Sequence, residues 1–221
     1  MLNKYLDKLE RKFGKYAVSQ LMLFIVIGMG IVYVFDYFLS VKPENTVSIT
    51  QLLYFDLDEI KHGQVWRAIS FLLLPPLAGN VIFVAFELYF LWLYGESLES
   101  QWGCFKFNVF YLIGVIATII TGLLTGYAVN AYLNLSLFLA FAIVFPDYVV
   151  NIFFIIPVKV KWLGMLVGVG MVWNFITGTW QVKFLILIAF ANIILFFGKD
   201  FFSRIYYFFR RYYYKWFKKM R

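Results

Sequence analysis

The sequence has little charge and almost no cysteine or histidine. Only 14% of its 221 residues are charged, and Cys104 and His62 are the single residues of their types. A soluble domain of this length needs more charge to cover its surface. One cysteine excludes an intrachain disulfide, and one cysteine with one histidine cannot form a Cys/His metal site. We therefore expect no metal and no other cofactor.

Apolar and aromatic side chains are abundant instead. Hydrophobic residues make up 63% of the chain and aromatic residues 23%, and the mean hydropathy is +0.79. Trp and Tyr favour the membrane–water interfaces, where the ring is buried and the polar atom stays hydrated. These values predict an all-α polytopic membrane protein. The charged segment 1–15 leads into a full-length span without a small-residue cleavage site, so we expect no cleavable signal.

Six apolar segments are candidate spans, because a helix needs roughly 20 apolar residues to cross the hydrocarbon. We predict spans at residues 17–39, 80–98, 107–127, 131–145, 161–177 and 182–198. The chain then divides into a basic N-terminal segment, a membrane domain and a basic aromatic tail, at residues 1–16, 17–198 and 199–221.

Two connecting segments have a predicted structure of their own. Residues 40–79 are too polar to span as a whole but contain amphipathic stretches. We predict a large first loop with short helices at the membrane surface, ended by Pro75-Pro76. Residues 149–156 are apolar but short and lie between Pro146 and Pro157. We predict an extended connector at the interface.

The distribution of Lys and Arg predicts the orientation. In a six-span topology, sixteen of the 20 basic residues lie on one side, and the exceptions are Lys42, Lys61, Arg67 and Lys183. Cytoplasmic loops carry the excess of Lys and Arg. We therefore predict that both termini are cytoplasmic and that the large loop is extracytoplasmic. Five or seven spans would place the two basic ends on opposite sides.

Glu87 lies in the middle of the second predicted span. An ionised carboxylate at that depth costs several kcal/mol, so such residues usually face the bundle interior, neutral or paired. One interpretation is structural, with a protonated carboxyl that holds helices together. The other is a polar cavity with a functional use.

Several smaller features have structural interpretations. In the first loop, Arg67 is expected to bond the loop's own carbonyl groups while Trp66 anchors at the headgroup level. Glu99 either caps the amides of a neighbouring helix end or is solvated. The small-residue pairs Gly122/Gly126 and Gly164/Gly168 allow close helix approach, and intramolecular packing is the simpler interpretation.

The tail after residue 198 mixes aromatic and basic residues, as in the run from Arg210 to Lys219. This composition predicts attachment to an anionic lipid surface. Nucleic-acid binding is the alternative for a basic aromatic stretch, but the preceding span favours the membrane, so we expect no nucleic-acid partner.

Three segments resemble the rhomboid superfamily, which includes intramembrane serine proteases and inactive relatives such as the iRhoms and Derlins. The loop carrying Trp66-Arg67 before Ser70-Phe71 is similar to the family's first loop. Leu91–Glu99 (LWLYGESLE) resembles the end of its second span, and Phe145–Trp162 resembles the segment after its fourth span in many bacterial members. The resemblance covers most of residues 50–200. It implies a six-span rhomboid-like bundle in a plasma membrane of bacterial type.

The family's catalytic residues are missing at the matching positions. The resemblance places Ala131 at the nucleophile position, followed by Tyr132, where active members have a Gly-x-Ser-Gly motif. The sixth span contains no histidine for the general base. The family's His-x-x-x-Asn in span two corresponds to Phe83 and Glu87. A serine without a base is a poor nucleophile, so the resemblance implies a pseudoprotease.

Three functions remain open from the sequence. The favoured one is a non-catalytic protein that binds transmembrane helices of client or partner proteins, with Glu87, Phe83, Ala131 and Tyr132 in the pocket. The second is an intramembrane protease with an unconventional site, such as Ser136 with Lys183 as base. The third is a small transporter or assembly subunit that uses Glu87.

Overall fold

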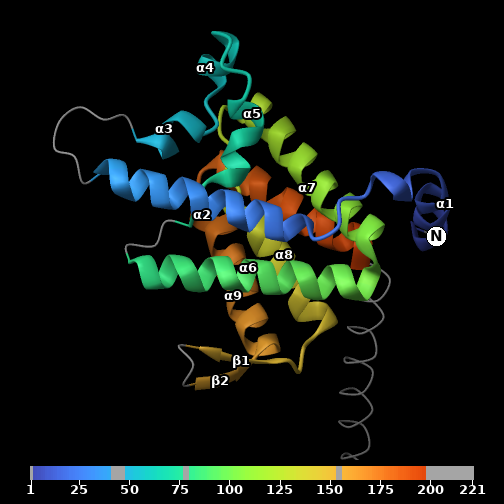
Figure 1. Ribbon diagram of the computed structural model, residues 1–221. Coiled ribbons are helices and arrows are strands. Elements are labelled where there is room, and N and C mark those ends of the chain that lie inside the picture. Colours follow the sequence, from blue (N-terminus) through green and yellow to red (C-terminus); the bar gives the residue numbers. More distant parts are fainter. Residues whose placement is uncertain (1, 41–47, 77–79, 153–155, 198–221) are drawn as a thin grey trace, which may run out of the picture.

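The computed structural model describes residues 2–40, 48–76, 80–152 and 156–197 (Figure 1). The N-terminal region consists of α1 (Leu2–Phe13), the short 3-10 helix η1 (Gly14–Tyr16) and the long apolar helix α2 (Leu21–Ser40). The first loop then forms α3 (Ile49–Leu53), α4 (Leu57–Lys61), α5 (Arg67–Ser70) and η2 (Phe71–Leu73).

The rest of the bundle consists of α6 (Val81–Trp102), α7 (Cys104–Thr125), α8 (Ala131–Val144) and α9 (Val160–Thr177). A helix at Trp180–Phe197 is the last one among the described residues and is called the last helix below. Among the described residues, five helices are long and apolar enough to cross a membrane: α2, α6, α7, α9 and the last helix. The chain is therefore a multi-pass membrane protein by the length and composition of its helices.

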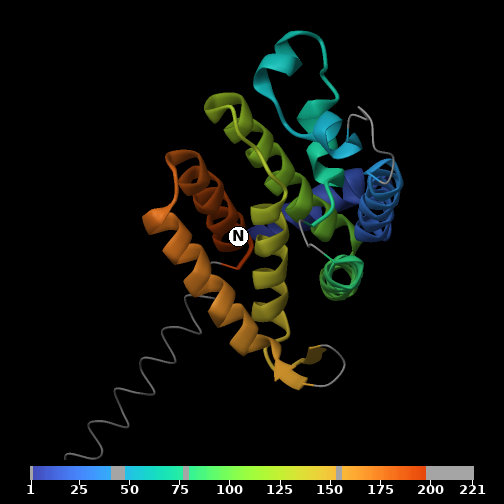
Figure 2. The ribbon, with the colours of Figure 1, turned by 90° about the vertical axis from the view of Figure 1, so that its left-hand side faces the viewer.

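The remaining predicted span, 131–145, corresponds to α8, which has only 14 residues. A helix of that length covers about 21 Å, less than the roughly 30 Å of a bilayer's hydrocarbon core. α8 is nevertheless the most enclosed of the bundle helices. Eight of its side chains are buried, and it packs on α6, α7 and α9. Figure 2 shows α8 standing between α9 and the α2–α6 side of the molecule.

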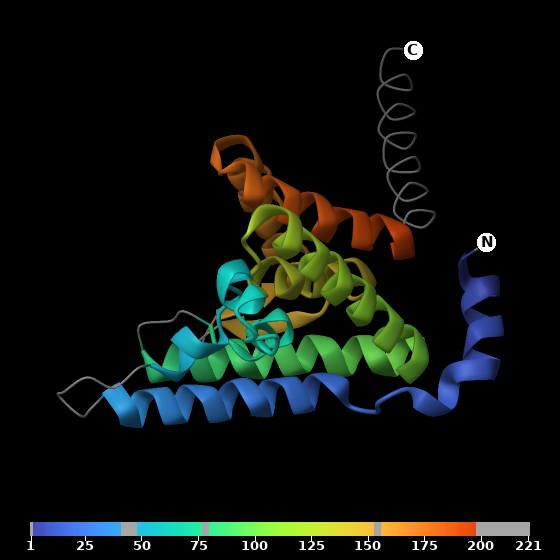
Figure 3. The same cartoon turned by 90° about the horizontal axis from the view of Figure 1, so that it is seen from above.

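α2 and α6 lie side by side (Figure 3). Gly95 of α6 allows this close approach, because a Cβ atom there would run into the side chain of Met22 on α2. α6 also continues further than the predicted end at residue 98. It meets α7 at Gly103, whose φ of 85° suits glycine and turns the chain sharply between the two helices.

The first loop packs against the membrane helices by its own apolar side chains. Phe55 and Phe71 form a small buried cluster with Leu74 and Ala128. The ring of Phe55 lies on Gly122 of α7, where a Cβ atom would be 2.6 Å from it. The prediction of a large loop with short helices is therefore confirmed for its described residues.

Of the other small residues predicted to allow close helix approach, Gly164 does so, and Gly126 and Gly168 do not. Gly164 of α9 packs on Ala142 of α8, which is an intramolecular contact as interpreted from the sequence. Gly126 instead ends α7 in a left-handed conformation, with φ of 77°. Gly168 has open space where a side chain would begin.

The described part of the predicted connector, residues 149–152 and residue 156, is extended, as expected. β1 (Val149–Ile152) and β2 (Ile156–Lys159) form an antiparallel hairpin with Val150 opposite Val158. Asp147, just before β1, accepts hydrogen bonds from Lys159 and Lys161 at 3.3 and 3.1 Å. These two ion pairs connect the hairpin to the start of α9.

Candidate functional site

The structure does not enclose Glu87 in the bundle. Glu87 and Phe83 both belong to the exposed residues of α6, and Phe83 is 45% exposed. Ala131 is exposed at the start of α8, and Tyr132 beside it is half-buried. The two cavities described below are not lined by any of these residues. The prediction that Glu87 faces the bundle interior is therefore corrected.

The reason lies in how α6 crosses α8. The contact between them is at Tyr94, whose ring lies 5.0 Å from the rings of both Phe138 and Phe141. The two helices cross steeply, since α6 is seen nearly end on in Figure 2 while α8 is seen from the side. The half of α6 before Tyr94, which carries Glu87, therefore extends past α8.

Arg67 of the first loop makes the contacts that the sequence indicated. Arg67 is buried, and its guanidinium donates to the carbonyl oxygens of Gln51 and Tyr54 at 2.9 and 3.2 Å. It also donates to the Gln64 side chain at 2.8 Å. The expected bonding of the loop's own carbonyls is thus confirmed. Trp66 is exposed, as an interfacial anchor would be.

Asn130, immediately before α8, joins this loop to the bundle. Its side-chain amide donates to the carbonyl oxygens of Leu72 and Leu74 at 3.3 and 2.9 Å. The side chain is buried. Asn130 therefore holds the end of the first loop against the start of α8.

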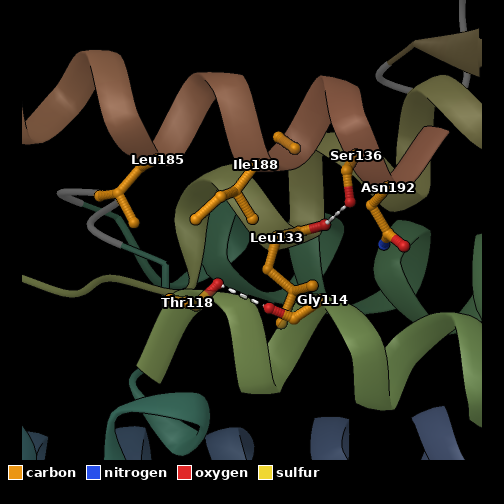
Figure 4. Close-up of a pocket in the computed structure, with 8 residues that line it drawn as sticks. Gly114, Thr118, Leu133, Ser136, Leu185, Ile188 and Asn192 are labelled. Atoms are coloured by element: carbon orange, nitrogen blue, oxygen red, sulfur yellow. Dashed lines mark hydrogen bonds between the residues drawn. The ribbon is translucent and has the colours of Figure 1, made fainter. Parts of the chain in front are cut away.

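Three buried polar side chains of the bundle lie together elsewhere, between α7, α8 and the last helix (Figure 4). Thr118, Ser136 and Asn192 come from these three helices, one from each, and all are at least 96% buried. They line a common void with Gly114 and Leu133. The void measures about 10 Å³, close to the smallest space that holds one water molecule.

Each polar side chain of this cluster bonds a backbone carbonyl. Ser136 donates to Leu133 at 2.7 Å, and Thr118 donates to Gly114 at 2.8 Å. Asn192 donates from Nδ2 to Phe110 at 3.3 Å, and its buried Oδ1 accepts no hydrogen bond from the described residues. The last helix is thus joined to α7 by a polar contact deep in the bundle.

The chemistry available here is limited to hydrogen bonding. The residues that line the void include no Lys, His, Asp or Glu that could take the proton of Ser136. The hydroxyl of Ser136 is also directed to Leu133, as is common for serine inside helices. Among the described residues, no group of three His, Cys, Asp or Glu side chains could hold a metal ion.

Single polar residues inside apolar segments are the sequence feature that corresponds to this cluster. Thr118, Ser136 and Asn192 are polar residues within long apolar segments of three different helices. In the sequence, Ser136 has only one functional interpretation, as a nucleophile with Lys183 as base. The shared location of the three residues depends on how the helices rotate and pack, which the sequence alone does not indicate.

The predicted lipid-binding tail, 199–221, lies outside the described residues. His62 directly follows α4 in the first loop and is exposed, as expected for a surface histidine.

In comparisons with known proteins, no family model, no curated protein and no solved structure matches this chain. Its function therefore has to be inferred from its own residues.

Proposed function

We propose that this chain is a catalytically inactive six-span membrane protein of rhomboid-like architecture that binds transmembrane helices of client or partner proteins. In this proposal α8 is the fourth of the six spans, in addition to the five long helices. Because neighbouring helices surround it, a helix shorter than the bilayer can pass through the centre of the bundle without exposing its backbone ends to lipid.

The observation that carries the proposal is the exposure of Glu87 in the middle of an apolar helix. Its carboxyl group makes no hydrogen bond or ion pair with the described residues of this chain. A carboxyl that faces lipid costs several kcal/mol. A polar group on a partner helix packed against the first half of α6 would remove that cost.

The surroundings of Glu87 suit an apolar partner helix. Val81, Ile82 and Phe83 are all exposed at the start of α6. α6 and α9 both pack on α8 but make little contact with each other. A partner helix could therefore contact α6 without displacing another helix of the chain.

The absence of catalysis in this proposal is supported by Ser136. Its hydroxyl is fully buried, is bonded to the Leu133 carbonyl and has no acid or base beside it in the void. Nucleophilic serines need an adjacent base. The enzyme alternative is tested with a serine-directed fluorophosphonate on the purified protein. We expect no labelling, and labelling that disappears in Ser136→Ala would favour a protease.

Site-specific photo-crosslinking in cells tests the binding function. A photo-reactive residue at Phe83 should capture discrete membrane proteins. Glu87→Leu should abolish these adducts, and Glu87→Gln should retain them, since an amide replaces a protonated carboxyl in most hydrogen bonds. A photo-reactive residue at Leu124, exposed at the far end of α7, is the matched control. The same adducts from Leu124, or adducts that survive Glu87→Leu, would contradict the proposal.

The orientation forms part of the proposal. The basic residues support cytoplasmic termini and an extracytoplasmic first loop. Reporter fusions at residues 60 and 221 test it. The fusion at residue 60 should report the extracytoplasmic side and the fusion at 221 the cytoplasm. An extracytoplasmic signal at residue 221 would exclude six spans with both ends inside.

A further inference from the structure

A long apolar groove runs between the N-terminal region and α7. One wall consists of the segment from Phe13 to Ile25, the other consists of α7, and Ile69 and Leu72 of the first loop close its far end. The groove measures about 710 Å³. This volume is in the range of small-ligand sites, about 300–1,000 Å³.

The groove is apolar along most of its length. Among its lining residues are Leu21, Ile25, Leu112, Val115, Ile116 and Ile119. Leu112 and Ile116 are about half exposed. These two residues belong to α7, one of the five helices long enough to span. The part of the groove along α7 therefore faces hydrocarbon and matches an acyl chain in polarity.

Two polar side chains lie at the end of the groove nearest α1. Asn108 is occupied, since its amide bonds both the N–H and the carbonyl of Val18 at 2.9 Å. Tyr111 is 3% exposed, and its buried hydroxyl has no hydrogen-bond partner among the described residues. A buried hydroxyl without a partner is costly. Because this hydroxyl is enclosed, a ligand in the groove does not reach it.

Two lysines lie at the same end of the groove. The Nζ atom of Lys12 is 5.3 Å from the ring centre of Phe13, and that of Lys15 is 4.9 Å from the ring centre of Tyr16. Both rings line the groove. Nearby acidic groups do not cancel this charge, because Asp7 pairs with Lys106 at 2.8 Å and only Glu10 remains on α1.

We propose that this groove binds an anionic phospholipid from the leaflet next to α1. The phosphate lies at Lys12 and Lys15, and an acyl chain extends along Leu112 and Ile116. The charge at one end distinguishes this site from ordinary lipid contact around the helices. The inference is independent of the client-binding function, since Glu87 is not among the lining residues.

Native mass spectrometry of the purified full-length protein in detergent tests the proposal. Phosphatidylglycerol and phosphatidylcholine with identical acyl chains are the two probes. Phosphatidylglycerol should bind more tightly than phosphatidylcholine. Lys12→Gln/Lys15→Gln should weaken the binding of phosphatidylglycerol about 30-fold, which corresponds to about 1 kcal/mol for each basic residue near an anionic lipid. Both lysines are exposed, so folding should be unaffected. The matched control is Lys159→Gln/Lys161→Gln, which removes two lysines near the hairpin and should leave binding unchanged.

The groove itself is tested by filling it. Ile116→Trp should block both lipids, whereas Leu166→Trp, at an exposed position of α9 outside the groove, should not. Equal binding of the two lipids, or equal losses in the two lysine pairs, would overturn the proposal.

A photo-reactive residue at Leu112 identifies the occupant in the cell membrane. We expect adducts whose mass corresponds to a phospholipid. Adducts with a protein in place of lipid would assign the groove to a partner helix and would also overturn the proposal.

Discussion

The carboxylate of Glu99, near the end of α6, accepts a hydrogen bond from the backbone N–H of Gln20 at 2.9 Å. Gln20 directly precedes α2, so this bond satisfies one of the amide groups that a helix leaves free at its start. Of the two sequence-based interpretations of Glu99, capping of a neighbouring helix end is the one that the structure confirms.

Removal of this cap should destabilise the bundle. Glu99→Ala is expected to lower the free energy of unfolding by about 1–2 kcal/mol, the usual value of a lost helix cap. Glu99→Gln keeps an acceptor oxygen and should cost less. Equilibrium unfolding in mixed detergent micelles, followed by tryptophan fluorescence, measures both. Glu96→Ala on the same helix is the control, and an equal loss there would show that the bond to Gln20 contributes nothing.

Arg67 should be indispensable for the folded first loop. Arg67→Ala leaves the carbonyl groups of Gln51 and Tyr54 without their donor and should cost about 2–4 kcal/mol. Arg67→Lys should recover only part of the loss, because an ammonium group cannot reproduce the guanidinium geometry. Limited proteolysis of the loop and unfolding experiments are the measurements. Lys61→Ala removes an exposed ion pair with Asp58 and should change stability by less than about 1 kcal/mol.

The approach of α2 to α6 can be tested at Gly95. In Gly95→Ala the new methyl group meets Met22, which should cost about 1–3 kcal/mol through overpacking. Gly168→Ala is the matched control, because nothing lies within 4 Å of its Cβ position. There the better helix propensity of alanine should stabilise the protein by up to about 1 kcal/mol. Equal effects at the two glycines would mean that α2 and α6 are not in close contact.

The ion pairs of Asp147 predict a pH dependence. Lys161 and Lys159 hold the pKa of the Asp147 carboxyl below its ordinary value of 3.8. Because the pKa is lowered in the folded state, the stabilisation is complete above pH 3.8 and is lost as the pH falls through the folded pKa. Carbon-13 NMR titration of Asp147 should give a midpoint below 3.8. In Lys159→Gln/Lys161→Gln the midpoint should return toward 3.8, and an unchanged midpoint would exclude the pairing.

The fold was predictable where it depends on the length of apolar runs. The five long helices lie at predicted spans because hydrophobicity over about 20 residues is a property of the sequence alone. Bonds within the first loop, such as those of Arg67, were also predictable, since a buried guanidinium must find acceptors near it in the chain.

The positions of polar side chains around the bundle were not predictable in this way. Depth in the membrane follows from position in the span, but the direction of a side chain depends on how two helices cross. The prediction for Glu87 was wrong for this reason, because Glu87 lies on an exposed face of α6 while Val84 on the same helix is buried. The cluster of Thr118, Ser136 and Asn192 was missed because its members approach one another only when three helices pack.

The cap on α2 has a consequence for the order of assembly during synthesis. α2 is translated before α6 and α7, yet its start is held by Glu99 and Asn108, which follow their partners by 79 and 90 residues. When α2 first enters the bilayer, neither partner has left the ribosome. α2 therefore enters the membrane before its start is capped. It reaches its final position only after α6 and α7 have been inserted beside it.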